Sequence, residues 1–340
     1  MHDAIYAQPG ALRLVMRGNE DALAGAVARL RDTDHVMLAG IGSSWHACLA
    51  GELLFAHAGG RGHRARAYLS FELVSYWPPP RSGLVVVSHS GGHRFTREAL
   101  ALAGGGGSVA ITGKGAPRLA AAYTLRTVDQ ESSLAHTVSY TCALAVLGAL
   151  AAAVGGNEEM AHAIDAIPDA LAMLLGQESW EELAARFGDR RRYWFVGGGP
   201  NTATAYEAAL KMKEAAHVSA EGMNCEQFLH GAWAGVDAED AVFVIAPPGP
   251  SRDRGVAVAR AARAIGAAVI ALGREDDREL NSLASETIAL PEIDEWLSPI
   301  LAVVPCQLFT YHTAVLRGVN PDTMRTDQPA HARARAELRL

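Results

Sequence analysis

The chain has 340 residues, of which 49% are hydrophobic and 20% charged, and its formal net charge is −7. This length accommodates two domains of ordinary size, and the acidic balance argues against non-specific nucleic-acid binding as the main task. The four cysteines lie far apart, and no pair has the spacing of zinc ligands. We therefore expect reduced thiols, no metal or cofactor, and a cytoplasmic location.

A targeting segment or membrane span is not expected either. Residues 1–9 lack the basic start and the apolar run of a signal peptide. The apolar segment 143–154 is shorter than a bilayer requires and is rich in alanine. The sequence thus predicts no membrane partner.

In chain order, one pattern of elements occurs twice. An apolar run at 35–39 leads through a glycine turn into a helix that ends near Ala56, and residues 193–196 begin an equivalent unit. Further pairs of apolar segments follow at an offset of about 160 residues, namely 84–87 with 242–245, 108–112 with 268–272, and 137–150 with 298–317.

Short Val/Ile/Leu runs that alternate with helical stretches are typical of a parallel sheet with helices on both faces. We therefore predict an α/β fold of two tandem domains, residues 1–175 with a helical N-terminal extension and residues 176–340. Each should be a helix–sheet–helix sandwich, and helices near 160–175 and 178–188 should connect them. The polar, Arg-rich tail 320–340 either covers a site or forms a solvated end.

Small hydroxyl residues and glycines follow two of the predicted strands in the first domain. In open α/β sheets, ligands bind beyond the C-terminal ends of the strands, and helix N-termini offer N–H groups to anions. Ordinary N-capping by serine is the alternative, but several such segments at equivalent strand ends favour a phosphate site. Its candidate residues are Ser43, Ser44, Ser88, His89, Ser90, His93, Thr96 and Thr137.

In the second domain, Glu207, Lys211 and Glu214 recur at i, i+4 and i+7, so they share one helix face. His230 follows sixteen residues after Glu214. A carboxylate, an ammonium and an imidazole near one sugar can open its ring and move a proton between adjacent carbons. Spacing alone leaves open a solvated face with an i, i+4 ion pair.

These motifs together resemble the tandem sugar-isomerase (SIS) domains that form the isomerase half of glutamine:fructose-6-phosphate amidotransferase. Stand-alone members of the family are sugar-phosphate isomerases, amino-sugar-phosphate deaminases and fructosamine-6-phosphate deglycases. The resemblance covers nearly the whole chain and rests on these segments: 5–9, 42–47, 88–91, Glu131 with Thr137, 207–214, 230–231 and 298–312.

The resemblance implies a role for each candidate residue. The Ser/Thr loops of the first domain would hold the phosphate of a sugar. Glu214 would shuttle a proton between C1 and C2, and His230 would open the ring, supplied across the interface of a homodimer. Lys211 and Glu207 would orient these groups, and Glu226 is a second carboxylate candidate with a structural role as its alternative.

The sequence departs from the amidotransferase pattern at three places. The glutaminase domain with its nucleophilic cysteine is not present in these 340 residues. The tail 325–340 contains no lysine for the Schiff base that the amidotransferase forms, and His331 lies near that position. The phosphate loop has Gly92-His93 where the family usually has Glu-Thr, a loss that His93 or Arg94 could offset by its charge.

We therefore expect an enzyme that isomerises, deaminates or deglycates a phosphorylated amino or keto sugar. One alternative is a sugar-phosphate-binding regulator without catalysis. Another is an isomerase-like subunit that receives ammonia from a separate glutaminase chain. We expect the remaining histidines to be packed or capping residues in helical segments, namely His46, His136, His217 and His312.

Overall fold

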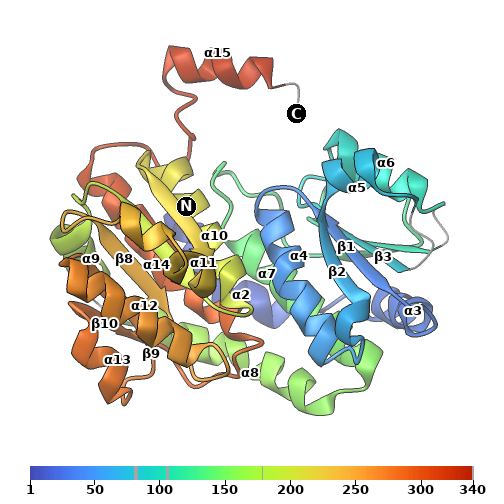
Figure 1. The fold of residues 1–340 in the computed structure, drawn as a ribbon. Helices are drawn as coiled ribbons and strands as arrows, with labels where there is room; N and C mark the ends of the chain where they lie inside the picture. The colour runs from blue at the N-terminus through green and yellow to red at the C-terminus, as the bar shows by residue number, and fades with distance from the viewer. Residues whose placement is uncertain (80–82, 105–106, 178, 339–340) are drawn as a thin grey trace. The chain divides into compact units, whose positions relative to one another are not determined.

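The computed structural model describes residues 1–79, 83–104, 107–177 and 179–338, and the chain divides into two compact units (Figure 1). The first unit comprises residues 7–131 and 136–168. The second comprises residues 1–6, 132–135 and 169 onward. The change of unit thus falls inside helix α8 (Glu158–Leu175) rather than near residue 175. Residues 1–6 join the second unit because helix α1 (His2–Tyr6) packs on helix α14 (Ser298–Leu316).

The first unit is built on a parallel sheet with the strand order β2-β1-β3-β4-β5. Its strands are β1 (Val36–Gly40), β2 (Ala65–Leu69), β3 (Gly83–Val87), β4 (Ser108–Thr112) and β5 (Tyr123–Arg126). Its helices are α2 (Gln8–Leu14), α3 (Glu20–Arg31), α4 (Ser43–His57), α5 (Ser70–Tyr76), α6 (Arg94–Leu102) and α7 (Val138–Gly155), with a short 3-10 turn at Gly62–Arg64.

Helices cover both faces of this sheet. Helices α4, α3 and α7 pack together on one side, and α5 and α6 pack together on the other. Alternate strand residues such as Ala39, Leu84 and Val86 face α5 and α6 and form a buried cluster with Leu73 and Leu100. The buried polar contact of Thr141 Oγ1 with Gln8 Oε1, 2.7 Å, joins α7 to α2.

The second unit repeats this topology. Its sheet has the order β10-β9-β8-β6-β7, which from the other edge is the order of the first sheet. Its strands are β6 (Tyr193–Gly197), β7 (Ala220–Asn224), β8 (Ala241–Ile245), β9 (Ala268–Gly273) and β10 (Glu286–Ala289). Its other helices are α9 (Trp180–Phe187), α10 (Asn201–Lys211), α11 (Cys225–Leu229), α12 (Arg252–Ile265), α13 (Arg278–Leu283) and α15 (Pro329–Glu337), and a 3-10 turn spans Ala232–Gly235.

The predicted α/β fold with two parallel sheets is confirmed, and each paired apolar run is a pair of equivalent elements. The sequence analysis did not predict four strands, and each of them is an edge strand of its sheet. Strands β2, β5, β7 and β10 are only partly buried. They therefore lack the continuous apolar run of the central strands, which are buried on both faces.

Helix α7 is longer than the sequence suggested. It spans 18 residues, so α7 and α14 are both long and apolar enough to cross a membrane by length and composition. Their apolar stretches are 83% and 78% buried within the protein. That burial is the property of core helices, which remain apolar because they face protein on nearly all sides.

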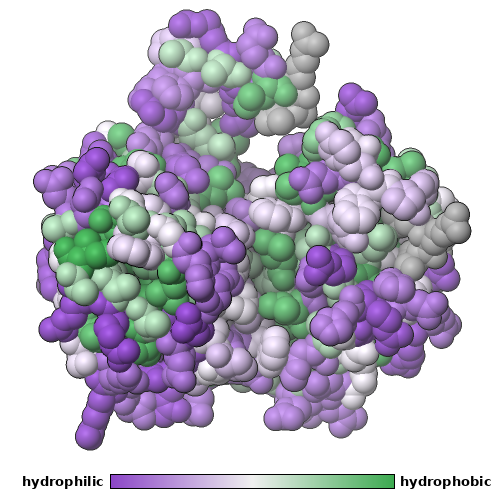
Figure 2. Space-filling model, viewed as in Figure 1, coloured by the Kyte–Doolittle hydropathy of each residue, from purple (hydrophilic) through white to green (hydrophobic). Residues whose placement is uncertain are grey.

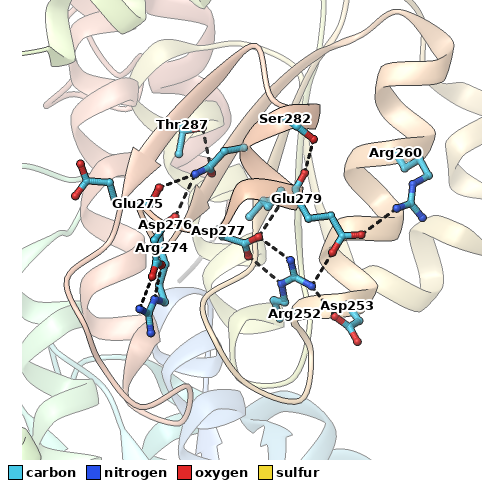
Figure 3. A network of polar contacts seen from close by, with 12 residues as sticks. Arg252, Asp253, Arg260, Arg274, Glu275, Asp276, Asp277, Glu279, Ser282 and Thr287 are labelled. Carbon is cyan, nitrogen blue, oxygen red and sulfur yellow. Dashed lines mark hydrogen bonds and ion pairs between the residues drawn. The ribbon is translucent and has the colours of Figure 1, made fainter.

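A network of ion pairs ties the start of α12 to the loop before α13 (Figure 3). Arg252 holds Asp277 with two parallel bonds, 2.8 Å from Nε to Oδ2 and 2.6 Å from Nη2 to Oδ1. Asp277 also accepts from the backbone N–H of Leu280 and so caps α13. Bidentate geometry makes this pair stronger than the single surface contacts around it.

Glycine allows helix α10 to lie directly against strand β7. A Cβ on Gly222 would lie 2.3 Å from the carbonyl oxygen of Ala205 and 2.7 Å from the Cα of Tyr206. Both are backbone atoms, so the helix itself would have to move. This close approach fixes the position of α10 on β7 just before Glu207.

Substituting Gly222→Ala should therefore lower the free energy of unfolding by about 1–3 kcal/mol, because the added methyl overpacks the helix–strand contact. Gly10→Ala is the matched control. Gly10 lies in α2 with open space around its Cα, so alanine there should stabilise by about 0.5–1 kcal/mol. Urea unfolding of both variants measures the difference, and equal stabilities would contradict the close packing of α10 on β7.

Candidate functional site

The loops after β1 and β3 meet at the point where the strand order of the first sheet reverses. In doubly wound sheets this switch point is where ligands bind. Gly42, at φ 57°, turns the chain from β1 into α4, and Ser43 and Ser44 form the first turn of that helix. Ser88 directly follows β3.

A cavity at this edge is lined by several polar side chains and has a volume of about 20 Å³. A single water needs roughly 10–15 Å³, so this space suits a small polar group rather than a whole sugar. It brings together three of the predicted phosphate residues, Ser43, Ser44 and His89. It adds five polar residues that the sequence analysis did not select for this site, Thr112, Thr127, His136, Ser139 and Tyr140.

The ring of His89 is buried with both nitrogens unpaired. Its backbone is held firmly, because its carbonyl oxygen accepts from Gly113 N–H at 3.0 Å, Gln130 Nε2 at 3.0 Å and Thr112 Oγ1 at 3.2 Å. Burial, followed by the nearby His136, lowers the pKa of His89 to about 4. His89 is therefore a neutral imidazole near pH 7 with one N–H to donate.

Two further predicted residues of this loop have distinct environments. Ser88 is buried and its hydroxyl is unpaired, as expected of a group that awaits a ligand. Ser90 Oγ accepts from the N–H of Gly92 at 3.3 Å and shapes the turn.

The remaining predicted residues lie on helix α6 or before α7. His93 is the N-cap residue of α6, and Thr96 is buried in its first turn. Arg94 pairs with Glu98 on the surface of α6 rather than with the loop. The phosphate-binding role of these residues stays a prediction.

Helix α7 already has a carboxylate at its N-terminus. Glu131 accepts from the backbone N–H groups of Thr137 and Ser139 and from both of their hydroxyls. In this structure the hydroxyl of Thr137 donates to Glu131, and its predicted role in phosphate binding stays a prediction. The helix dipole favours a negative charge at this position.

The second unit uses the equivalent crevice differently. The loop after β8 ends at Ser251, whose N–H and hydroxyl both donate to the buried carboxylate of Glu295. Gly249 approaches the same carboxylate so closely that a Cβ would lie 2.2 Å from Oε2. A carboxylate therefore fills this position in the second unit. Phosphate binding at the first-unit crevice stays a prediction.

The Lys211 ammonium lies between two carboxylates of its own helix. Its Nζ is 3.3 Å from Glu207 Oε1 and within hydrogen-bond distance of Glu214 Oε2. Lys211 and Glu207 are 1% and 0% exposed, whereas the Glu214 side chain is 14% exposed. Burial alone would lower the pKa of Lys211, but the two carboxylates outweigh it and raise the pKa above its ordinary value.

The interpretation of this face as a solvated surface is therefore wrong, because its central charge is buried. Helix α10 ends at Lys211 and continues into a π-helical turn, Met212–Ala216. Such turns are rare and are frequent at functional sites. Glu214 lies in this turn and is the member of the group that solvent can reach.

His230 and Glu226 form a second pair at helix α11. Nε2 of His230 is 3.1 Å from Glu226 Oε2, and the imidazole is 76% exposed. Glu226 also pairs with Arg254, and that hydrogen bond lowers the pKa of the carboxyl. Within the part of the chain that the structure describes, His230 makes no hydrogen bond or ion pair to the Lys211 group.

His136 and His217 flank helical segments rather than lying inside them, and His331 lies in the C-terminal helix. His136 lies before α7, lines the first-unit cavity and meets the His89 ring edge-on at 5.1 Å between centroids. His217 ends the π-helical turn in a left-handed conformation, φ 59°. His331 lies on α15, whose surface in Figure 2 mixes hydrophilic and moderately hydrophobic residues, and its Nδ1 is buried and unpaired.

The described residues contain neither a metal-ligand cluster nor a disulfide. They contain no cluster of three or more His, Cys, Asp or Glu side chains that could hold a metal ion. All four cysteines are free and buried, and burial raises the pKa of each thiol.

The depressed pKa of His89 makes a prediction about acid stability. Between pH 6.5 and about pH 4, His89 is protonated in the unfolded chain but neutral in the folded chain. The free energy of unfolding therefore decreases as the pH falls through this range. His89→Gln should remove up to about 3 kcal/mol of that loss at pH 4 and change little at pH 7.5. The exposed His63→Gln is the control. Unfolding free energies from pH 4 to 8 test this, and an unchanged profile in His89→Gln would contradict it.

Residues 187–317 match the SIS domain family. The glutamine–fructose-6-phosphate aminotransferase (isomerizing) of Thermococcus kodakarensis is 31% identical over 341 residues, which cover 94% of this chain and 56% of that protein. The chain spans about half the length of the curated relatives it matches.

Two solved structures have the same fold along nearly the whole chain. The C-terminal domain of glucosamine-fructose-6-phosphate aminotransferase from Francisella tularensis superimposes with a TM-score of 0.83 at 19% identity, covering 95% of this chain and 97% of that one. For the tagatose-6-phosphate ketose/aldose isomerase from Escherichia coli the TM-score is 0.81 at 20% identity, with coverage of 95% and 94%. At these identities the likeness shows fold alone. Residues 187–317, which lie in the second unit, thus belong to the SIS domain family, and the first unit has a parallel sheet of the same strand order.

Proposed function

We propose that this protein moves a proton between C1 and C2 of a phosphorylated amino or keto sugar, and so isomerises, deaminates or deglycates it. The observation that carries the proposal is the buried Lys211 between Glu207 and the partly exposed Glu214. Two relatives are named for fructose 6-phosphate and tagatose 6-phosphate, and these names support a sugar phosphate as the substrate.

Glu214 is the proposed base. A carboxylate can take the proton from a carbon next to a carbonyl or imine and return it to the neighbouring carbon. The reaction develops negative charge on an enediol oxygen, and a fixed ammonium close by stabilises such charge. Lys211 is held by Glu207 from the opposite side, so its position does not depend on the substrate.

The first-unit crevice is the proposed phosphate site. Ser44 and His89 line its cavity, and Ser88 has a buried hydroxyl without a partner. These are neutral donors, and they suit a phosphate because its oxygens are acceptors. Helix α4 begins at the same edge, and the positive end of its dipole favours an anion there.

Glu214→Gln should lower kcat by roughly 10²–10⁴-fold, because the amide keeps the shape but cannot accept the proton. Binding of the sugar phosphate should remain within a few-fold of wild type. Glu221→Gln, an exposed position on β7, is the matched control and should keep full activity. Turnover is measured with hexosamine 6-phosphates, fructosamine 6-phosphates and hexose 6-phosphates, by ammonia release and by ketose formation. Normal turnover of Glu214→Gln would refute the assignment.

The exposed ring of His230 supports the proposal that a second copy of the chain completes the site in a homodimer. Each active centre would then combine Glu214 of one copy with His230 of the other. Glu214→Gln and His230→Ala would each be inactive alone. Mixed and re-equilibrated, they should recover about a quarter of wild-type activity, because half of the dimers are mixed and each has one intact centre. No recovery, with mixed dimers verified, would place both residues in one copy.

The substrate panel also separates the two rivals. Stabilisation of the fold by a sugar phosphate without any product would identify a regulator. Amination of fructose 6-phosphate that requires added ammonia or a separate glutaminase would identify a partner-dependent synthase. The buried charges of the Lys211 group favour catalysis, because burying charges costs free energy and strongly perturbed ionisable groups cluster at functional sites.

A further inference from the structure

A second cavity of about 740 Å³ lies within the second unit, apart from the crevices beyond the strand ends. This volume is in the range of small-molecule sites. Its walls come from the end of α9, the end of the π-helical turn, the end of α14 and the chain that follows α14. Small apolar side chains form part of the lining, namely Ala184, Ala185, Ala216, Leu316 and Val319.

Cationic and polar groups complete this lining. Arg325 is partly buried and bonds through Nη2 to Gln328 Oε1 at 3.0 Å. Among the residues that the structure describes, no carboxylate pairs with it. Arg317 and Asp189 both line the cavity, and Nη1 of Arg317 lies 3.8 Å from Oδ1 of the fully exposed Asp189. Nε2 of His217 is buried and unpaired, and burial followed by Arg325 lowers the pKa of this ring.

Backbone strain is concentrated at the same place. Over the described residues, three non-glycine residues have positive φ: His217 at 59°, Met324 at 47° and Arg325 at 60°. Two of them line the cavity, and the third precedes Arg325. Glycine would adopt these angles at no steric cost. Strained residues of this kind gather at binding sites, where the side chain compensates for the strain.

From this geometry we infer that the cavity is a binding site for a small organic phosphate. Arg325 and Arg317 offer guanidinium groups, which bind phosphate through two parallel bonds. His217 offers one further polar nitrogen, and the alanine-lined wall accommodates an organic body. The phosphate would compensate the uncompensated charge of Arg325.

Occupancy of this site would bear on the reaction. Ala216 and His217 line the cavity and end the turn that contains Glu214. A ligand that holds His217 would therefore hold the turn and the position of the proposed base. This consequence for catalysis rests on the proposed function, but binding itself does not.

Binding is tested by calorimetry in a Ser44→Ala, Ser88→Ala background, which removes two of the proposed phosphate donors of the first-unit crevice. The probes are pyrophosphate, AMP and citrate at constant pH. Arg325→Gly removes the guanidinium and suits the backbone angle, so its melting temperature should not fall, while its affinity for pyrophosphate or AMP should weaken at least about tenfold. Arg335→Gly, on the exposed α15, is the matched control.

Saturable binding of pyrophosphate or AMP that Arg325→Gly weakens and Arg335→Gly does not would support the site. Binding of citrate alone, equal binding by both variants, or no binding would overturn it. These outcomes are independent of turnover. If the proposed function holds, the bound probe should also change kcat or KM of the otherwise wild-type chain, and Arg325→Gly should abolish that change.

Discussion

The salt bridge of Lys211 with Glu207 and Glu214 is the interaction on which the proposed chemistry of the second unit depends. Taking three charges out of water costs several kcal/mol per ion, and the attraction between opposite charges at close range offsets this cost. Removing one partner would leave an uncompensated buried charge, so the three residues act together. Helix α10 ends at Lys211, and the π-helical turn that follows contains Glu214, whose side chain is partly exposed to solvent.

The surrounding packing makes that burial possible. Helix α10 lies against α14 and against strand β7, where Gly222 removes the side chain that would separate them. The helix is rich in alanine, so its backbone approaches its neighbours closely. Small residues around a charged centre keep water out and hold the centre rigid, and both effects strengthen electrostatic stabilisation during a reaction.

The two units show how one topology is used in two ways. Both have the same strand order, and each has a carboxylate shortly before a long buried helix. Glu131 precedes α7 in the first unit, and Glu295 precedes α14 in the second. Glu131 binds to the start of α7 and leaves the loop after β3 open, with Ser88 and His89 unpaired. Glu295 reaches across to Ser251 and fills the equivalent position. The same residue type thus fills the crevice of the second unit and leaves the polar groups after β3 of the first unit unpaired.

The sequence by itself determined the duplicated α/β fold, because central strands buried on both faces must be continuous apolar runs. It also determined that Glu207, Lys211 and Glu214 share a face, since helical periodicity is a local property. The partly exposed edge strands carry weaker patterns and were not predicted.

Only the tertiary structure decided whether the Lys211 face is buried or solvated, because burial depends on β7 and α14 rather than on spacing. The same holds for Glu295, which lies 44 residues from the serine that it binds, and for the side chains that gather around His89. These contacts join segments far apart in the chain, and no local pattern records which of them will meet.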